Sequence, residues 1–187
     1  MNDALEVFEP VSTTPIGHRI LHAATELFRE RGIMTTSVDS IVERAGTTKR
    51  TFYQRFGSKD LLVACYLRQR AHVWQVELLE ALGDVPPAIG LSIIYQHAAQ
   101  WSSRNPRGCA FVNAWAEIGA SDHEAADVVR AEKAWMLALF THIAGGDSSR
   151  GTLLHVLYEG AQVTASVQGE RAVFNRTCAA SQALLAQ

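Results

Sequence analysis

The stretch TSVDSIVERAGTTKRTFYQRFGSKD, residues 36–60, contains two short amphipathic segments that meet at Gly46. In the first segment Val38, Ile41 and Val42 recur at helical spacing and predict one buried face. Gly46 permits a sharp turn because glycine adopts positive φ values readily. The second segment, residues 49–56, carries Phe52 and Phe56 four residues apart, so both rings are expected to face the core. Two short helices joined by a tight turn predict a helix-turn-helix.

Helical signals continue on both sides of this stretch. Residues 16–31 predict a preceding helix, which ends at Gly32 and whose apolar stripe is Ile20, Ala24, Leu27 and Phe28. Thr36 is the expected N-cap of the second helix, with Asp39 three residues later completing a capping-box-like start. Thr48 can cap the third helix, and Ser58 is placed to cap a fourth over residues 59–82.

The helix-turn-helix stretch is locally basic. Five basic residues and no acidic residue lie between Arg44 and Lys59, whereas residues 60–187 carry nine basic and twelve acidic residues. A basic stripe confined to one segment is typical of a single DNA-binding face, although an ordinary solvated helix face is equally compatible with the charge alone. The candidate DNA-binding residues are Thr36, Thr48, Lys49, Arg50, Thr51, Tyr53, Gln54, Arg55 and Lys59.

The side chains of this set suit different contacts with duplex DNA. Lys49 and Lys59 suit phosphates, as do the three threonine hydroxyls. Gln54 can pair with adenine, and Arg55 can reach backbone or base. Arg50 can fork onto a guanine edge, a contact worth about 1–3 kcal/mol of discrimination. A phosphate clamp or a solvated arginine is an equally good interpretation of Arg50.

The rest of the chain predicts helices and no strands. Further helices are expected over residues 88–104, 109–119, 122–143, 148–167 and 169–186, separated by Gly, Pro, Asn and Asp clusters. The predicted fold is therefore all-α, with about nine helices. Residues 1–15 predict a mobile arm, residues 16–60 the DNA-binding domain, and residues 61–187 a helical ligand-binding and dimerisation domain.

Composition limits the class of protein. The 187 residues carry a net charge of −2, and hydrophobic residues make up 48%, enough for a proper core. The three cysteines form no CxxC pair, which fits reduced thiols in a cytoplasm. Residues 1–17 lack the features of a signal peptide, and no apolar run is long enough for a membrane span. We expect a soluble cytoplasmic protein with no membrane partner.

Several residues match a known family at once. Gly32, Thr36, Ala45-Gly46, Thr48-Lys49, Thr51-Phe52-Tyr53, Phe56 and Ser58-Lys59-Asp60-Leu61 resemble the DNA-binding domain of tetracycline-repressor (TetR) transcriptional regulators over residues 16–63. Residues 107–114 resemble a stretch common in that family's C-terminal domain. Two positions depart from the pattern: Thr47 replaces an apolar residue, usually Val, and Arg50 replaces a small one.

The resemblance implies a nine-helix homodimer that binds operator DNA through its first three helices. It implies that the fourth helix links them to a ligand-binding domain and that the last two helices of each subunit form the dimer interface. A small molecule would release the operator, as in a ligand-responsive repressor. The resemblance also makes Tyr53 a phosphate contact.

Residues 88–160 are rich in large amphipathic side chains. An apolar cavity with a few polar groups is the usual small-molecule site. The candidate ligand-binding residues are His97, Trp101, Phe111, Asn113, Trp115, Trp135, His155 and Tyr158. The alternative is that these residues simply fill the core.

Two apolar stripes near the C-terminus are candidates for self-association. One consists of Leu153, Leu157, Ala161 and Thr164, and the other of Phe174, Cys178 and Leu185. Some of these residues are expected to belong to the subunit's own core. A two-fold dimer would place two reading helices about 34–36 Å apart, the spacing of a palindromic site.

Other chemistry is weakly indicated. Cys109 follows Arg107-Gly108 at a helix start, where a redox sensor or simply a small residue in a turn is compatible with the sequence. His18 and His22 could share a metal, but no third ligand is evident, so no metal site or cofactor is expected. No nucleotide-binding, metalloprotease or hydrolase motif is present, and no catalytic residues are proposed. A small all-α enzyme and a helical protein-interaction module are the rival interpretations.

Overall fold

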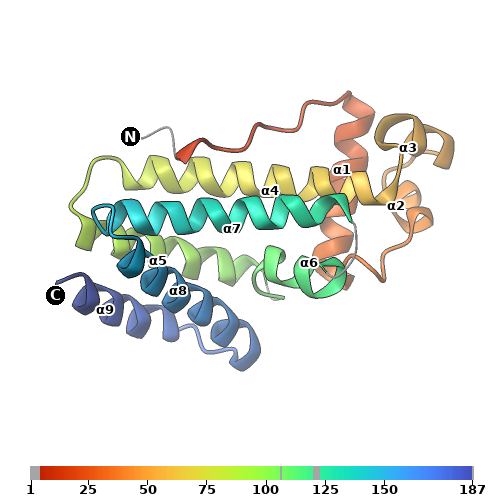
Figure 1. Ribbon diagram of the computed structural model, residues 1–187. Coiled ribbons are helices and arrows are strands. Elements are labelled where there is room, and N and C mark those ends of the chain that lie inside the picture. Colours follow the sequence, from red (N-terminus) through yellow and green to blue (C-terminus); the bar gives the residue numbers. More distant parts are fainter. Residues whose placement is uncertain (1–4, 106, 120–122, 187) are drawn as a thin grey trace. The chain divides into compact units, whose positions relative to one another are not determined.

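The computed structural model describes residues 5–105, 107–119 and 123–186, and these residues form nine helices (Figure 1). The helices are α1 (Pro15–Arg31), α2 (Val38–Arg44), α3 (Lys49–Phe56), α4 (Lys59–Leu82), α5 (Pro87–Arg104), α6 (Ala110–Ile118), α7 (Glu124–Ile143), α8 (Ser148–Gln168) and α9 (Val173–Leu185). The all-α prediction is confirmed. The predicted start of the seventh helix, residue 122, lies outside the described residues.

One helix begins later than the sequence indicates. Gly169 was expected to open the last helix, but α9 begins at Val173. Gly169 takes the left-handed conformation (φ 68°) that ends α8. Glycine adopts this conformation without the steric penalty of a Cβ, so it serves as the C-cap of one helix and not as the start of the next.

The chain divides into two compact units. The head unit comprises residues 8–73 and 110–131, and the body unit comprises residues 1–7, 74–109 and 132–187. The division falls within α4 and α7. The DNA-binding domain predicted to end at residue 60 is therefore only part of the head unit, and its boundary stays a prediction about function.

The head unit is built on contacts among α1, α2 and α3. The predicted apolar stripe of α1 is buried, and Ile41 and Val42 of α2 are buried beside it. Phe52 is fully buried and Phe56 nearly so, which confirms that both rings face inward. The two rings lie 6.1 Å apart. Because Phe52 and Phe56 fix the inner side of α3, the opposite side of this helix faces solvent.

The N-terminal arm is not free within the part of the chain that is described. The backbone N–H of Val11 donates to Gln69 Oε1 on α4 at 3.0 Å, and the Phe8 carbonyl lies 2.7 Å from His72 Nδ1. Thr14 then caps α1 by accepting from the N–H of Gly17. Residues 8–11 thus contact α4, which offers polar partners for the arm's backbone, and the mobility of residues 1–15 stays a prediction. Residues 1–4 lie outside the described residues.

The body unit has one apolar core among α5, α8 and α9 and the parts of α4 and α7 that belong to it. Tyr95 and Tyr158 lie at its centre with ring centroids 5.9 Å apart. The Tyr95 hydroxyl lies 2.9 Å from Ser181 Oγ on α9, so the buried phenol has a polar partner. Burial raises the pKa of Tyr95 to about 12.

Candidate nucleic-acid interface

Helix α3 presents polar side chains to solvent over its whole length. Its N-cap Thr48 accepts a hydrogen bond from the N–H of Thr51 at 3.2 Å, and Gly57 ends it with φ 74°. Thr51 Oγ1 lies 3.1 Å from Thr48 Oγ1 and is half-buried. The exposed residues are Thr48, Lys49, Arg50, Tyr53, Gln54 and Arg55. The helix therefore places most of the candidate residues on one accessible surface.

Lys49 is held by an acidic residue of α2. Its Nζ lies 2.7 Å from Asp39 Oδ1, and both side chains are exposed. This hydrogen bond raises the pKa of Lys49, with the charge of Asp39 adding to the effect. The pair links the start of α3 to the start of α2 across the turn. Lys49 would have to share its ammonium group between Asp39 and a phosphate.

The basic stripe is less isolated in space than in sequence. The Arg44 guanidinium donates to both carboxylate oxygens of Glu30 on α1, at 2.8 and 3.1 Å. Glu26 lies 4.0 Å from the same guanidinium. With Lys49, two of the five basic residues are thus engaged by an acidic residue of an earlier helix. Sequence reasoning missed Glu26 and Glu30 because they lie fourteen or more residues upstream of Arg44.

Thr36 does not occupy the position that the sequence indicates. The N-cap of α2 is Ser37, whose side chain accepts from the N–H of Ser40 at 3.1 Å. The Thr36 side chain is only 1% exposed, and its hydroxyl donates to the Gly32 carbonyl at 2.7 Å. The predictions of Thr36 as N-cap and as phosphate contact are therefore both corrected. Ser37 is exposed and takes over the capping role, and the signal for it was its position directly before Val38.

Lys59 opens α4 beside its cap. Ser58 Oγ accepts from the N–H of Leu61 at 3.0 Å, which confirms the predicted cap. The side chain of Lys59 is half-buried, and this burial lowers its pKa, against the opposite effect of Asp60 and Glu117. Its ammonium group lies at a helix start, where backbone N–H groups also favour anions.

The comparisons with known proteins bear on this same segment. Residues 20–65 match the family described as "Bacterial regulatory proteins, tetR family". A TetR-family transcriptional regulator from Streptomyces coelicolor has the same fold, with a TM-score of 0.83 and 28% identity over 91% of this chain and 94% of that one. The chain thus carries the DNA-binding domain of the TetR family, and its fold is that of a TetR-family regulator.

Curated relatives match a shorter part. An uncharacterised HTH-type transcriptional regulator of Bacillus subtilis is 41% identical over 54 residues, which are 29% of this chain and 28% of that protein. An HTH-type transcriptional repressor of Mycobacterium tuberculosis is 38% identical over 58 residues, 31% of each chain. The match thus spans less than a third of the length of these relatives. TetR proteins are regulators and not enzymes, which decides against the enzyme alternative.

The two departures from the TetR pattern have different surroundings. Thr47 is half-buried, and its backbone N–H donates to the Val42 carbonyl at 2.9 Å. The turn is thus closed by its backbone whichever side chain stands at this position. Arg50 lies on the exposed side of α3, in its first turn. A long cationic side chain at this position alters the exposed surface of α3, which is the candidate DNA-binding surface.

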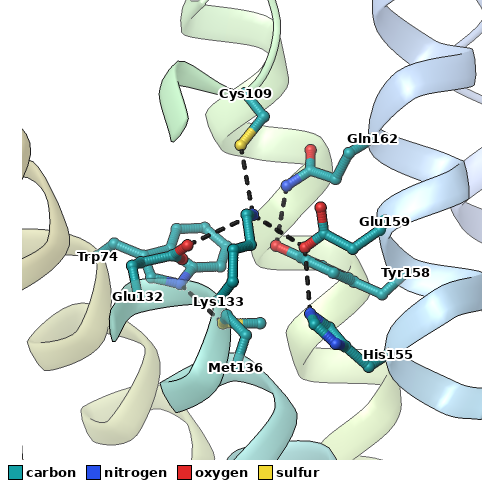
Figure 2. A network of polar contacts seen from close by, with 9 residues as sticks. All are labelled: Trp74, Cys109, Glu132, Lys133, Met136, His155, Tyr158, Glu159 and Gln162. Atoms are coloured by element: carbon teal, nitrogen blue, oxygen red, sulfur yellow. Dashed lines mark hydrogen bonds and ion pairs between the residues drawn. The ribbon is translucent and has the colours of Figure 1, made fainter. Parts of the chain in front are cut away.

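The body unit holds a buried charged cluster that sequence reasoning missed (Figure 2). Lys133 of α7 donates from Nζ to Glu159 Oε1 of α8 at 2.9 Å, and Glu132 Oε2 lies 3.3 Å from the same nitrogen. His155 Nε2 lies 3.3 Å from Glu159 Oε1. The only signal in the sequence is the pair Glu132-Lys133, which interrupts an apolar helix.

The two carboxylates of this cluster differ in their surroundings. Burial raises the pKa of Glu132, whose contact with Lys133 is an ion pair without good hydrogen-bond geometry. Burial also acts on Glu159, but its contacts with His155 and Lys133 outweigh burial and lower the pKa of that carboxyl. Burial raises the pKa of Tyr158 well above its usual value, and Gln162 donates to its hydroxyl at 2.9 Å.

The candidate ligand-binding residues are divided between the units. His155, Tyr158, His97, Trp101 and Trp135 belong to the body unit, and Phe111, Asn113 and Trp115 belong to the head unit. Tyr158 and His155 belong to the charged cluster, as Figure 2 shows. His97 and Trp101 instead surround Trp74, at ring distances of 4.7 and 5.2 Å.

The remaining ligand candidates differ in exposure. Trp135 and Phe111 are buried, and Asn113 is half-buried. Trp115 is 43% exposed, with the Arg130 guanidinium 5.2 Å from its ring centroid. Trp115 therefore does not simply fill the core of the head unit. Whether these residues contact a ligand stays a prediction.

The candidate dimer residues fall into two groups. Ala161 and Phe174 are buried in the body unit's own core, so they are corrected to core residues. Leu153 is exposed, and Leu157, Thr164, Cys178 and Leu185 are half-buried. The exposed apolar residues of α8 are Leu153, Val156, Val163 and Val167. Three of these residues were absent from the prediction because a stripe one position away on the same helix also looked apolar.

Neither a metal-ligand cluster nor a membrane-spanning helix occurs within the described residues. Within residues 5–105, 107–119 and 123–186, no group of three or more His, Cys, Asp or Glu side chains is arranged to hold a metal ion. His22 instead lies 3.8 Å from Glu26 on its own helix. Among the same residues no helix combines the length and the apolarity that a membrane crossing requires.

Proposed function

We propose that this TetR protein is a transcriptional repressor that binds palindromic operator DNA as a homodimer and is released by a small molecule. The observation that carries the proposal is the two-sided character of α3. Phe52 and Phe56 anchor its inner side, while Lys49, Arg50 and Tyr53 lie exposed on the outer side. A rigidly anchored helix with exposed cations and hydrogen-bonding groups has the chemistry needed in the major groove. Operator binding would place the protein in the cytoplasm.

The reading surface combines phosphate and base contacts. Arg55, Tyr53, Thr48, Thr51 and Lys59 supply hydroxyl groups and cations to the backbone, with Ser37 added to the predicted set because it is exposed at the start of α2. Gln54 and Arg50 supply the base-reading groups. Lys49 contributes through its pair with Asp39, which holds the starts of α2 and α3 together.

Helices α8 and α9 support the homodimer. The exposed residues Leu153, Val156, Val163 and Val167 of α8, with Gly160 among them, recur at three- and four-residue spacing along one face. The exposed face of α9 carries Ala179, Ala180 and Ala183, whose small side chains permit close helix approach. Such a face is expected to be covered by a second copy, because monomers rarely leave a continuous apolar stripe in water.

A route from the effector to the reading head is present in the head unit. Glu117 Oε2 of α6 accepts from the backbone N–H of Met34, in the turn between α1 and α2, at 2.7 Å. His123 Nε2 lies 3.2 Å from Asp60 Oδ1 at the start of α4. A ligand that shifts α6 and the start of α7 would thus disturb two contacts of the head unit, one at the turn between α1 and α2 and one at the start of α4. Such a ligand would combine an apolar body with polar groups, because its candidate contacts are aromatic and imidazole side chains.

Salt-dependent binding to duplex DNA tests the proposal. We expect the logarithm of the binding constant to fall linearly with the logarithm of the salt concentration, because phosphate contacts release counterions. A Tyr53→Ala/Arg55→Ala double variant should bind more weakly at every salt concentration, whereas Arg171→Ala, an exposed cation beyond α8, should bind like the wild type. Fluorescence anisotropy of a labelled duplex measures this. Equal affinity of the double variant and the wild type would contradict the proposal.

A further inference from the structure

Cys109 and Lys133 form a pair for which the proposed DNA-binding function has no use. Cys109 directly precedes α6, and Lys133 lies on α7, both within the body unit. Lys133 Nζ donates to Cys109 Sγ at 3.7 Å, as Figure 2 shows. We propose that this pair is an oxidative modification site, at which a small peroxide oxidises the thiol and the lysine amine then closes a covalent N–S bond.

The site is open to a small oxidant. Cys109 is half-buried, and the Lys133 side chain is 24% exposed. Cys109 follows Gly108, whose φ of 78° turns the chain and whose missing side chain leaves room for Ser166. The sulfur is thus fixed at the start of a helix, while the lysine stem has four flexible carbons with which to approach it.

The chemistry balances in two steps. First, the thiol of Cys109 reacts with hydrogen peroxide, which takes the sulfur to sulfenic acid and leaves one water molecule. Second, the neutral amine of Lys133 attacks the sulfenyl sulfur, so that an N–S bond forms, the S–O bond breaks and a second water molecule leaves. Peroxide is the oxidant, and the pair loses two hydrogen atoms in total. A thiol such as dithiothreitol reverses the link by attack on sulfur.

The neighbours of Lys133 favour its ammonium form, so the amine has to lose a proton before it attacks the sulfur. Burial lowers the pKa of Lys133, but the charges of Cys109, Glu132 and Glu159 outweigh this and raise it well above its usual value. A sulfenic acid is neutral, so after oxidation of the sulfur the two carboxylates still hold the ammonium group. Its proton leaves to solvent, to which the Lys133 side chain is 24% exposed, and the resulting neutral amine attacks the sulfur.

The other cysteines provide internal controls. Burial raises the pKa of Cys65, which disfavours the reactive thiolate. The Cys178 thiol lies 3.9 Å from Ser92 Oγ, which cannot form an N–S bond. The sequence contains three lysines, Lys49, Lys59 and Lys133, and the first two lie in the DNA-binding segment. A link between Cys109 and Lys133 is therefore easy to recognise.

Mass spectrometry of the peroxide-treated full-length protein tests the site. After trypsin, we expect the peptide of residues 108–130 joined to that of residues 131–150, at the sum of their masses minus two hydrogen atoms. The Cys65→Ser/Cys178→Ser variant should form the link, and Cys109→Ser should not. Lys133→Gln should instead retain a sulfenic acid that dimedone traps. Oxidation of Cys109 to sulfinic acid or a disulfide in the wild type, without an N–S link, would overturn the proposal.

A regulatory role for this link rests on the proposed function. We expect peroxide to change the DNA affinity of the wild type several-fold and dithiothreitol to restore it, with neither effect in Cys109→Ser. If the linked protein bound DNA unchanged, the regulatory role would be wrong. If reduced protein bound no DNA but the link still formed, the proposed function would fail and the modification site would stand.

Discussion

At the scale of single residues, Arg50 and Lys59 illustrate two ways in which a cation can serve a DNA-binding surface. Arg50 is exposed on the outer side of α3, whereas Lys59 is half-buried at the start of α4. An arginine on a reading helix can fork onto a guanine edge, and a lysine at a helix start suits a phosphate. The two residues should therefore respond differently to truncation.

We predict that Arg50→Ala relaxes base preference, with a loss of about 1–3 kcal/mol of discrimination at one position of the site. Lys59→Ala should weaken binding to all sequences alike and reduce the salt slope by about one unit. Selection from random duplexes measures the first effect, and salt titrations measure the second. An unchanged sequence preference of Arg50→Ala would assign Arg50 to the phosphates or to solvent.

Glu132 makes the stability of the folded protein depend on pH. Because burial raises its pKa above the usual 4.5, the folded state holds this proton more tightly than the unfolded state does. The stabilising contribution of the proton is complete below pH 4.5 and is lost as the pH rises through the folded-state pKa. Glu132→Gln, which mimics the protonated carboxyl, should lack this loss.

Urea unfolding at several pH values measures the effect. We expect the free energy of unfolding of Glu132→Gln, minus that of the wild type, to increase as the pH rises from 4.5 towards 8. The exposed Glu80→Gln is the matched control and should follow the wild type. A constant difference between Glu132→Gln and the wild type at all pH values would show that Glu132 titrates normally.

The sequence predicted which side chains of α3 are exposed better than it predicted their surroundings. Helical periodicity sufficed to place Phe52 and Phe56 inside, and with them Arg50 and Tyr53 outside. The hydrogen bond from Arg44 to Glu30 depends on the packing of α1 against α2. The spacing of residues within one helix gives no information about that packing. The exchange of roles between Thr36 and Ser37 is a one-residue shift of a helix start, which neighbouring hydroxyl residues make hard to resolve.

At the scale of elements, the helices were predicted well because glycine and proline mark their ends, as Gly32 and Gly57 do. The exceptions have physical reasons. No pattern in the sequence indicated that the backbone of Phe8 and Val11 contacts α4 through Gln69 and His72, two polar side chains far away in sequence. Periodicity along a segment cannot reveal a partner that another helix supplies.

The exposed face of α8 leads to a prediction about self-association. Val163→Glu places a charge in the middle of the apolar stripe and should convert the dimer to monomers, because an unpaired charge is costly to bury at an interface. Ile89→Glu is the matched control, an equally exposed apolar residue on α5. Light scattering coupled to size exclusion measures the mass. A dimeric Val163→Glu protein would place the interface elsewhere.

At the scale of the whole molecule, the link between effector and DNA is open to a fluorescence experiment. The chain has four tryptophans, and the candidate ligand contacts include three of them, Trp101, Trp115 and Trp135. We predict that any metabolite that releases the protein from DNA also changes tryptophan emission. A metabolite library screened for both signals tests this. A ligand that releases the DNA but leaves the tryptophan emission unchanged would contradict a ligand site lined by these tryptophans.

The central claim is that two copies of the reading head bind duplex DNA across a two-fold axis. The most direct measurement is selection of bound sequences from random duplexes with the purified wild-type protein, followed by sequencing. We predict an enriched palindrome whose half-site centres lie about one helical turn, roughly 34–36 Å, or a multiple of it apart. Enrichment of no sequence, or of a single site without two-fold symmetry, would contradict the account.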